Sequence, residues 1–186
     1  MIDSMIKTVQ SSEVEITELM VPAYANFGGK VHGGILLSLM DKVAYVCAAK
    51  YSHQYCVTVA VEGVAFLNPV EVGELVSFKA SVNYVGRTTM IVGIRVEASN
   101  PRTEETKHTN SCYFTMAAKN DAGELVEVPK LVLENEVQLR RFCEGKLIKA
   151  FSAEKRRILK ADLHDMTTEQ RIAQCTEERC EIHFIH

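Results

Sequence analysis

The sequence predicts an α+β fold in which a long antiparallel sheet wraps around one central helix, with a helical extension at the C-terminal end. Three observations lead to this prediction. Residues 33–51 form one apolar helical stretch, and four segments with a two-residue apolar alternation follow it. The third observation is a change of composition beyond Leu133, where the chain becomes rich in charge and has one glycine and no proline.

Length and composition bound the class of protein. A chain of 186 residues with 47% apolar and 24% charged residues has enough apolar side chains for one globular core, and general disorder is excluded. We expect an N-terminal segment at residues 1–12, one domain at 13–133 and a helical extension at 134–186. The net charge of −3 gives no reason to expect a nucleic acid as a partner.

Three further features bear on the compartment. The first ten residues carry only Asp3 and Lys7 as charges, without the charged-then-apolar order of a secretory leader. The stretch Gly33–Tyr51 has membrane length, but Asp41 and Lys42 at its centre would be costly in a bilayer. We therefore interpret it as a buried helix and expect no membrane contact. The six cysteines follow no disulfide-like pattern, so a reduced, cytoplasmic setting is expected.

The elements of the predicted domain follow from periodicity and turn residues. A first strand is expected at Glu13–Met20, and a loop rich in turn formers follows at Val21–Val31. The helix begins at Gly33, ends near Tyr51 and is apolar on nearly every face, so we expect it to be enclosed on all sides. The four alternating strands are expected at Tyr55–Phe66, Glu74–Tyr84, Met90–Ala98 and Thr106–Ala118.

The sequence of the C-terminal extension predicts two or three helices. Thr167 with Gln170 three residues later fits a capping box at the start of the last helix. The charges of the ten acidic and ten basic residues in the extension cancel, so the extension concentrates no positive potential. We expect a docked cap that covers apolar surface through side chains such as Phe142 and Phe151. The alternative is a lid that closes over a neighbouring site with Lys155–Lys160.

Asp41 is the first candidate for chemistry. A charged and unpaired carboxylate within an almost wholly apolar helix is costly, so this side chain needs a partner or a purpose. It either pairs with Lys42, lies on a solvated edge of the helix, or belongs to an active site, where such groups cluster.

Two more candidates lie where the helix begins. The segment Val31-His32-Gly33-Gly34 places unpaired N–H groups and the positive end of the helix dipole at a position that glycines open to a ligand. Such groups suit a developing oxyanion, although a glycine-rich turn is the simpler explanation. Asn26, on the preceding loop, has an amide that can orient a water or a carbonyl, or that merely favours a turn.

Together these residues resemble the signature of the hotdog-fold acyl-CoA thioesterase family. That family carries an Asn or Gln, then His-Gly-Gly or Phe-Gly-Gly, then an Asp or Glu on the central helix. This chain has Asn26, five residues, His32-Gly33-Gly34, and then Asp41 eight residues after Gly33. The downstream segments Phe66-Leu67-Asn68-Pro69-Val70-x2-Gly73 and Val85-Gly86-Arg87-Thr88-Thr89-Met90 also resemble the family. The similarity runs from about Val14 to Val128.

The resemblance implies hydrolysis of acyl-CoA to a free acid and CoA, without a metal or redox cofactor. It implies that Asp41 is the catalytic carboxylate, as general base on water or as nucleophile. The backbone N–H of Gly33 would polarise the thioester carbonyl, and Asn26 would position the water or thioester. His32 and Gly34 lie at the edge of this site, and we expect His32 to pack or hydrogen-bond locally rather than to exchange protons.

Helix geometry adds an argument about assembly. Eight residues separate Gly33 from Asp41 by about 12 Å along the helix axis, yet both groups must lie near one thioester carbonyl. Two antiparallel helices side by side would bring Gly33 of one chain to Asp41 of the other. We therefore expect a dimer as the minimal active unit, and the resemblance implies a hexamer built as a trimer of dimers.

The phosphates of coenzyme A need a cationic or N–H-rich surface. Arg87 and Thr88, in the turn between two predicted strands, are the expected CoA contacts. We expect no metal site. The spacing Cys175-x4-Cys180-x2-His183-x2-His186 offers four potential zinc ligands but is not a common zinc pattern.

Two other functions use the same kind of fold. A non-catalytic protein that senses acyl-CoA would need a DNA-binding segment, for which the dozen residues before the first strand leave little room. A hotdog hydratase or dehydratase relies on an Asp/His pair at another spacing. Because fold alone does not separate these functions, the arrangement of Asn26, Gly33 and Asp41 decides for the hydrolase.

Overall fold

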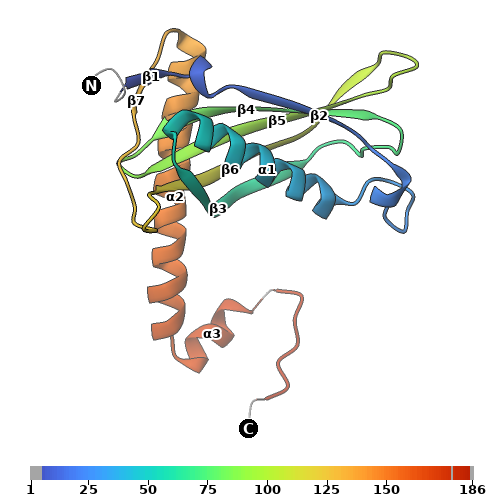
Figure 1. Ribbon diagram of the computed structural model, residues 1–186. Coiled ribbons are helices and arrows are strands. Elements are labelled where there is room, and N and C mark those ends of the chain that lie inside the picture. The colour runs from blue at the N-terminus through green and yellow to red at the C-terminus, as the bar shows by residue number, and fades with distance from the viewer. Residues whose placement is uncertain (1–5, 177, 185–186) are drawn as a thin grey trace. The chain divides into compact units, whose positions relative to one another are not determined.

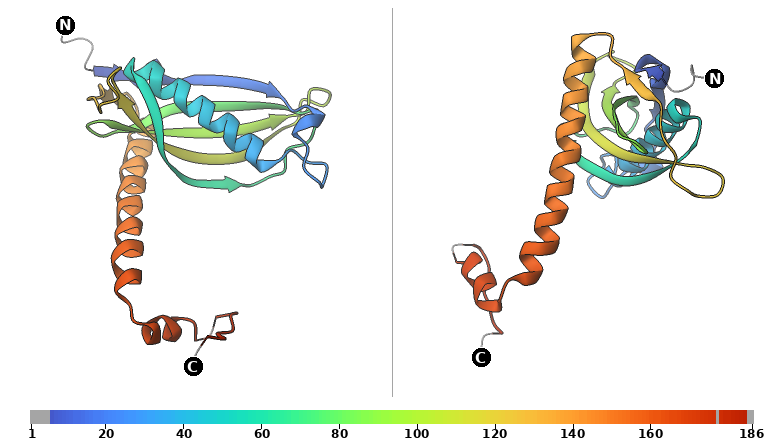
Figure 2. Two further views of the ribbon diagram at one scale, coloured as in Figure 1. Left: turned by 60° about the horizontal axis from the view of Figure 1, so that its bottom comes forward. Right: turned by 90° about the vertical axis from the view of Figure 1, so that its left-hand side faces the viewer.

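A five-stranded antiparallel sheet curves around one side of a central helix in the computed structural model, which describes residues 6–176 and 178–184 (Figures 1 and 2). The sheet order is β2-β4-β5-β6-β3, and α1 contacts β3, β4, β5 and β6. The elements are β1 (Ile6–Thr8), β2 (Val14–Leu19), α1 (Gly33–Ser52), β3 (Tyr55–Phe66), β4 (Leu75–Val85), β5 (Thr89–Ser99), β6 (Thr106–Lys119), β7 (Lys130–Val132), α2 (Glu136–Asp165) and α3 (Thr168–Gln174). The α+β prediction is confirmed.

The core lies between α1 and the inner face of the sheet. Alternation along β4 and β5 places every second side chain on α1, and Phe78 and Val92 are fully buried there. Met40 and Cys47 of α1 face the same core. Each such side chain contributes about 1.5–3 kcal/mol on burial, so the core holds α1 firmly in the curve of the sheet.

One face of α1 is exposed, which differs from the predicted full enclosure. Tyr45 and Val46 are each 40% exposed, and Ser38, Asp41 and Lys42 lie on the same side. The helix is apolar on nearly every face, yet the sheet of a single chain reaches only one side of it. An apolar face left open on a rigid helix is a surface that another molecule can cover.

A short parallel pair, β1 with β7, was absent from the sequence prediction. Ile6 pairs with Lys130 and Thr8 with Val132. Three residues are too few to show an alternation, and the two partners lie far apart in the chain, so periodicity could not reveal them. The predicted N-terminal segment at 1–12 therefore supplies one strand to the body of the protein, as far as its residues 6–12 show.

The chain divides into two compact units after Lys146, within α2. In the first unit, Phe142 packs on the Tyr84 ring at a centroid distance of 4.9 Å, and Gly145 lies so close that an added Cβ would be 2.7 Å from the Tyr84 Cβ. In the second unit, the predicted capping box of Thr167 and Gln170 is confirmed. Phe151, expected to dock, is 69% exposed.

Two truncations test where the folded body ends. A chain that stops after Lys146 keeps the contacts of Phe142 and Gly145 with Tyr84, so its first unit should stay folded. A chain that stops after Leu133 loses them and should lose about 2 kcal/mol or more of stability. Thermal melts followed by circular dichroism would measure this, and equal melting temperatures for the two chains would contradict it.

Candidate active site

Asp41 lies on the exposed face of α1 and is held by a hydroxyl from the sheet. The Thr58 Oγ1 of β3 donates to Asp41 Oδ1 at 2.6 Å. No salt bridge joins Asp41 to Lys42 or to any other cation in residues 6–176 and 178–184. The bond to Thr58 fixes the carboxylate and leaves Oδ2 available to accept a proton.

Thr58 is a site residue that sequence reasoning missed. The alternation of Val57, Val59 and Val61 predicts an apolar face on the side of the strand opposite Thr58. In the structure, β3 has register shifts after Thr58 and after Val61, and Val59 and Val61 are 50% and 42% exposed. Thr58 lies in the regular part of β3, before the first register shift, and shares a face of the strand with the buried Cys56, so it is turned toward α1. A lone hydroxyl residue among valines was the available signal.

The start of α1 presents an N–H group to the outside. His32 is the N-cap, and its Nδ1 accepts from the Gly34 N–H at 2.8 Å, as expected for a locally bonded histidine. Within the described part of the chain, the Gly33 N–H donates to no protein group. Phe66 lies against Gly33, where an added Cβ would be 3.1 Å from the ring. Glycine therefore keeps this helix start open and close to the aromatic ring.

Asn26 is oriented by its own loop. Its Oδ1 accepts from the N–H groups of Gly28 at 2.9 Å and Lys30 at 3.1 Å. With the oxygen occupied, the Nδ2 amide is the group left for a ligand, and no described residue accepts from it. Asn26 is thus arranged as a hydrogen-bond donor. Phe27, beside it at the tip of the loop, is fully exposed.

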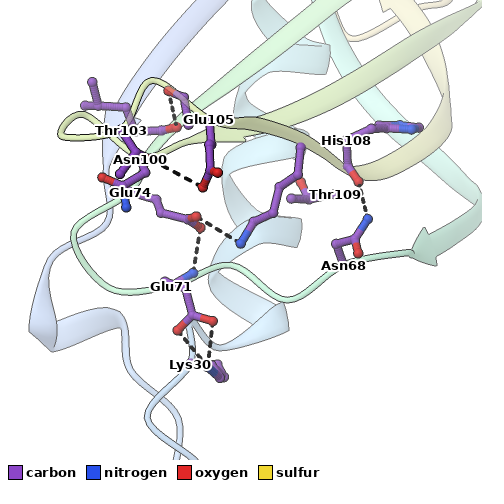
Figure 3. Close-up of polar contacts among 12 residues, drawn as sticks. Lys30, Asn68, Glu71, Glu74, Asn100, Thr103, Glu105, His108 and Thr109 are labelled. Carbon is purple, nitrogen blue, oxygen red and sulfur yellow. Dashed lines mark hydrogen bonds and ion pairs between the residues drawn. The ribbon is translucent and has the colours of Figure 1, made fainter.

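The loop of Asn26 is tied to the connection between β3 and β4 (Figure 3). The Lys30 Nζ contacts both carboxylate oxygens of Glu71, at 2.6 and 2.8 Å, and the Val31 N–H donates to Val70 O. Glu74 accepts from the Glu71 N–H and pairs with Lys107 of β6 at 2.9 Å. These contacts fix the position from which Asn26 and Gly33 approach a ligand.

A single chain keeps its two groups of candidate residues apart. Asn26 and Gly33 lie at the start of α1, whereas Asp41 and Thr58 lie about 12 Å further along the helix axis. An open depression of about 520 Å³ lies beside Asp41, lined mainly by aromatic and aliphatic side chains that include Tyr45 and Tyr55. It offers apolar surface to an acyl group or to another chain, but no N–H donor of α1.

Comparison with known proteins decides the family. Residues 28–105 match the thioesterase superfamily. The protein VdlD of Helicobacter pylori is 46% identical over 145 residues, which are 78% of this chain and 82% of that protein. The solved structure of an apo-hexameric acyl-CoA thioesterase is 28% identical, with a TM-score of 0.79 over 83% of this chain and 99% of that one. The hexameric thioesterase y2039 from Yersinia pestis is 30% identical, with a TM-score of 0.58 over 62% of this chain and 93% of that one. The chain belongs to the hotdog-fold acyl-CoA thioesterase family.

The expected CoA contacts of this thioesterase lie in the turn between β4 and β5. Arg87 is largely exposed, and its Nε pairs with Glu127 Oε1 at 3.0 Å. The carbonyl of Thr88 accepts from the Ala118 N–H, so the turn is anchored to the sheet. Met90 and Thr58 both pair with Met116 of β6, which places the turn at the end of the sheet that holds Asp41.

The cysteines of the thioesterase do not supply a nucleophile in its core. Burial raises the pKa of the Cys47 and Cys112 thiols to about 12, so they stay protonated. Cys175, Cys180 and His183 of the discounted zinc pattern form no ligand cluster, and no three His, Cys, Asp or Glu side chains of the described residues do so. His186 lies outside the described residues. No described helix is both long and apolar enough to span a membrane.

Proposed function

We propose that this thioesterase hydrolyses acyl-CoA to a free carboxylic acid and CoA at a site made by two copies of the chain. The observation that carries the proposal is the division of α1. Its start offers the unbonded Gly33 N–H, and the loop before it offers the Asn26 amide, while its middle offers Asp41 held by Thr58. Each half is organised for a ligand, and neither half is sufficient alone.

A two-fold axis near the middle of α1 would join the two halves. On the helix, Leu37 lies midway between Gly33 and Asp41. On β3, Phe66 contacts Gly33 and Thr58 contacts Asp41, and Glu62 lies midway between them. One axis passing near both midpoints would bring the helix start of each copy to the carboxylate of the other. The positions on the helix and on the strand thus both support the proposed pairing.

The surfaces at this axis suit an interface between copies. β3 is an edge strand of twelve residues, so its outer backbone groups can pair with β3 of a second copy. The exposed Tyr45 and Val46 of α1 and Val59 and Val61 of β3 would be covered in the same step. We propose a homo-oligomer built from such dimers, with a hexamer as the expected assembly because two similar thioesterase structures are described as hexameric.

In the proposed reaction, Asp41 Oδ2 removes a proton from water while the water oxygen attacks the thioester carbonyl. The Gly33 N–H and the Asn26 Nδ2 of the second copy stabilise the negative charge that develops on the carbonyl oxygen. Cleavage of the C–S bond releases the carboxylic acid and CoA, whose sulfur takes up the proton that Asp41 had removed from water. Direct attack by Asp41, followed by hydrolysis of the anhydride, uses the same groups. Protein groups carry every step, so we propose no metal or redox cofactor.

The six free cysteines support a reducing, cytoplasmic location.

Release of CoA thiol from a chain-length series of acyl-CoA substrates tests this function. Hydrolysis of at least one chain-length class well above the rate in buffer is expected. Saturable binding of acyl-CoA without thiol release would contradict the proposal and favour a sensor. Hydration of an enoyl-CoA without loss of the thioester would favour a hydratase.

Arg87→Ala should raise KM for acyl-CoA by more than it lowers kcat, because phosphate contacts lie far from the thioester and contribute uniform binding. A pantetheine thioester, which lacks the nucleotide, should show no such penalty. Glu127→Gln is the matched variant, since it removes the carboxylate that pairs with Arg87 and should leave KM unchanged or lower it. Equal increases in KM for both substrates would mean that Arg87 acts through structure.

A further inference from the structure

A second cavity lies on the outer face of the sheet, away from α1. It has a volume of about 640 Å³ and is bounded by β2, β4, β5, β6 and the first turns of α2, all within the first compact unit. Residues that alternate with the core residues, and so lie on the opposite face of the sheet, line this cavity: Ser81 and Asn83 on β4, Gly93 on β5 and Tyr113 on β6. None of them takes part in the proposed hydrolysis.

Asn83 forms the floor of this outer cavity and has an unused donor. It is 6% exposed and sits at the register shift between Val82 and Tyr84. The Ser81 hydroxyl donates to Asn83 Oδ1 at 3.0 Å, which fixes the amide with its nitrogen as the remaining group. Within residues 6–176 and 178–184, no group accepts a hydrogen bond from Asn83 Nδ2, and this nitrogen is accessible to solvent. It therefore faces the cavity.

The position of the Asn83 amide depends on the glycine at position 93. A glycine in the middle of a strand costs about 0.5–1 kcal/mol relative to alanine and often marks a close approach. Here an added Cβ would be 2.2 Å from Asn83 Nδ2 and 3.2 Å from the Tyr113 ring. Any other residue at position 93 would displace the Asn83 amide and fill the floor of the cavity.

The cavity that Asn83 lines is also lined by an arginine without a carboxylate partner among the described residues. Arg141 of α2 lines the cavity and is half-buried, and within the described residues it forms no salt bridge. The other nearby charges are engaged: Arg140 pairs with Glu144, and Lys79 and Arg95 both pair with Glu97. Glu13 and Glu15 lie on the β2 side of the opening. Burial, with a hydrogen bond to Glu144, raises the pKa of Tyr113 to about 12, so its phenol remains neutral.

We propose that the outer cavity binds a small anionic ligand, whose carboxylate or phosphate group accepts hydrogen bonds from Asn83 Nδ2 and the Arg141 guanidinium. An anion satisfies both unused donors at once, and a buried charge-assisted pair of this kind is stronger than either contact with water. The site is separate from the proposed hydrolysis, so it stands or falls independently of that function.

Ligand-dependent melting of the full chain tests the proposal, with inorganic phosphate and acetate as the probes at constant ionic strength. The rise of Tm with concentration gives Kd for each probe and shows whether phosphate or carboxylate is preferred. Arg141→Gln and Asn83→Asp should each weaken the preferred anion at least about tenfold, since each removes a charge-assisted contact. Asn83→Asp keeps the oxygen that accepts from Ser81.

Two control variants make the result specific. Lys146→Gln makes the same change of charge on α2, outside the cavity wall, and should leave Kd unchanged. Arg87→Ala should also leave it unchanged, and loss of the effect in that variant would place the anion at the CoA surface and overturn the proposal. No effect of either anion on Tm, or equal affinity in Arg141→Gln and the unaltered chain, would overturn it too. A change of oligomeric state in Arg141→Gln without a change in Kd would mean that the cavity is a contact between copies.

Discussion

Asp41→Asn should lower kcat by about 10²-fold or more, because it removes the only carboxylate placed at the centre of α1 while keeping the shape of the side chain. The amide oxygen can still accept from the Thr58 hydroxyl, whose bond to Asp41 measures 2.6 Å. Folding and assembly should therefore be retained. The measurement is the rate of CoA thiol release at saturating substrate, with Tm and oligomeric state as controls.

Thr58→Val separates orientation from proton transfer in the same half of the site. It preserves the shape of the residue and removes the donor to Asp41 Oδ1, so kcat should fall by less than in Asp41→Asn. A kcat near that of the unaltered enzyme in well-folded Asp41→Asn would end the proposed role of the carboxylate.

The sequence was sufficient to predict the main elements of the fold because their apolar residues recur with a clear helical or strand periodicity. The predicted helix and the four strands after it agree with the observed bounds within one residue at each end. Alternation along β4 is almost uninterrupted, and α1 is bounded by glycines at its start and by His53 in a left-handed conformation at its end. Such boundaries depend on local chemistry, which the sequence carries directly.

What could not be predicted depends on contacts distant in sequence. β1 and β7 pair across more than a hundred residues, and the contact of Thr58 with Asp41 joins β3 to α1 across seventeen residues of the chain. The donor role of Asn26 follows from two backbone N–H groups that occupy its oxygen, a detail of loop geometry. The boundary at Lys146 reflects packing on Tyr84, whereas composition changes earlier, beyond Leu133.

Mixing two inactive variants should restore activity if each site uses two chains. Asn26→Ala disables the half-site at the start of α1, and Asp41→Ala disables the half-site at its middle. In a mixed dimer, one site collects both defects and the other has neither. Random pairing of equal amounts makes half of the dimers mixed, so about a quarter of all sites should work. The two proteins would be unfolded together, refolded, and assayed for release of CoA thiol.

A matched mixture distinguishes a composite site from nonspecific rescue. Thr58→Val and Asp41→Ala both lie in the same half-site, because Thr58 donates to Asp41 within one chain. In their mixed dimer each site keeps one defect, so the activity of the mixture should stay at the mean of the two separate variants. Recovery in the first mixture but not in the second would locate Asn26 and Asp41 of each working site on different chains. If verified mixed dimers of Asn26→Ala and Asp41→Ala stay inactive, both residues act within one chain, and the roughly 12 Å between the helix start and Asp41 must then be closed by a movement of the Asn26 loop.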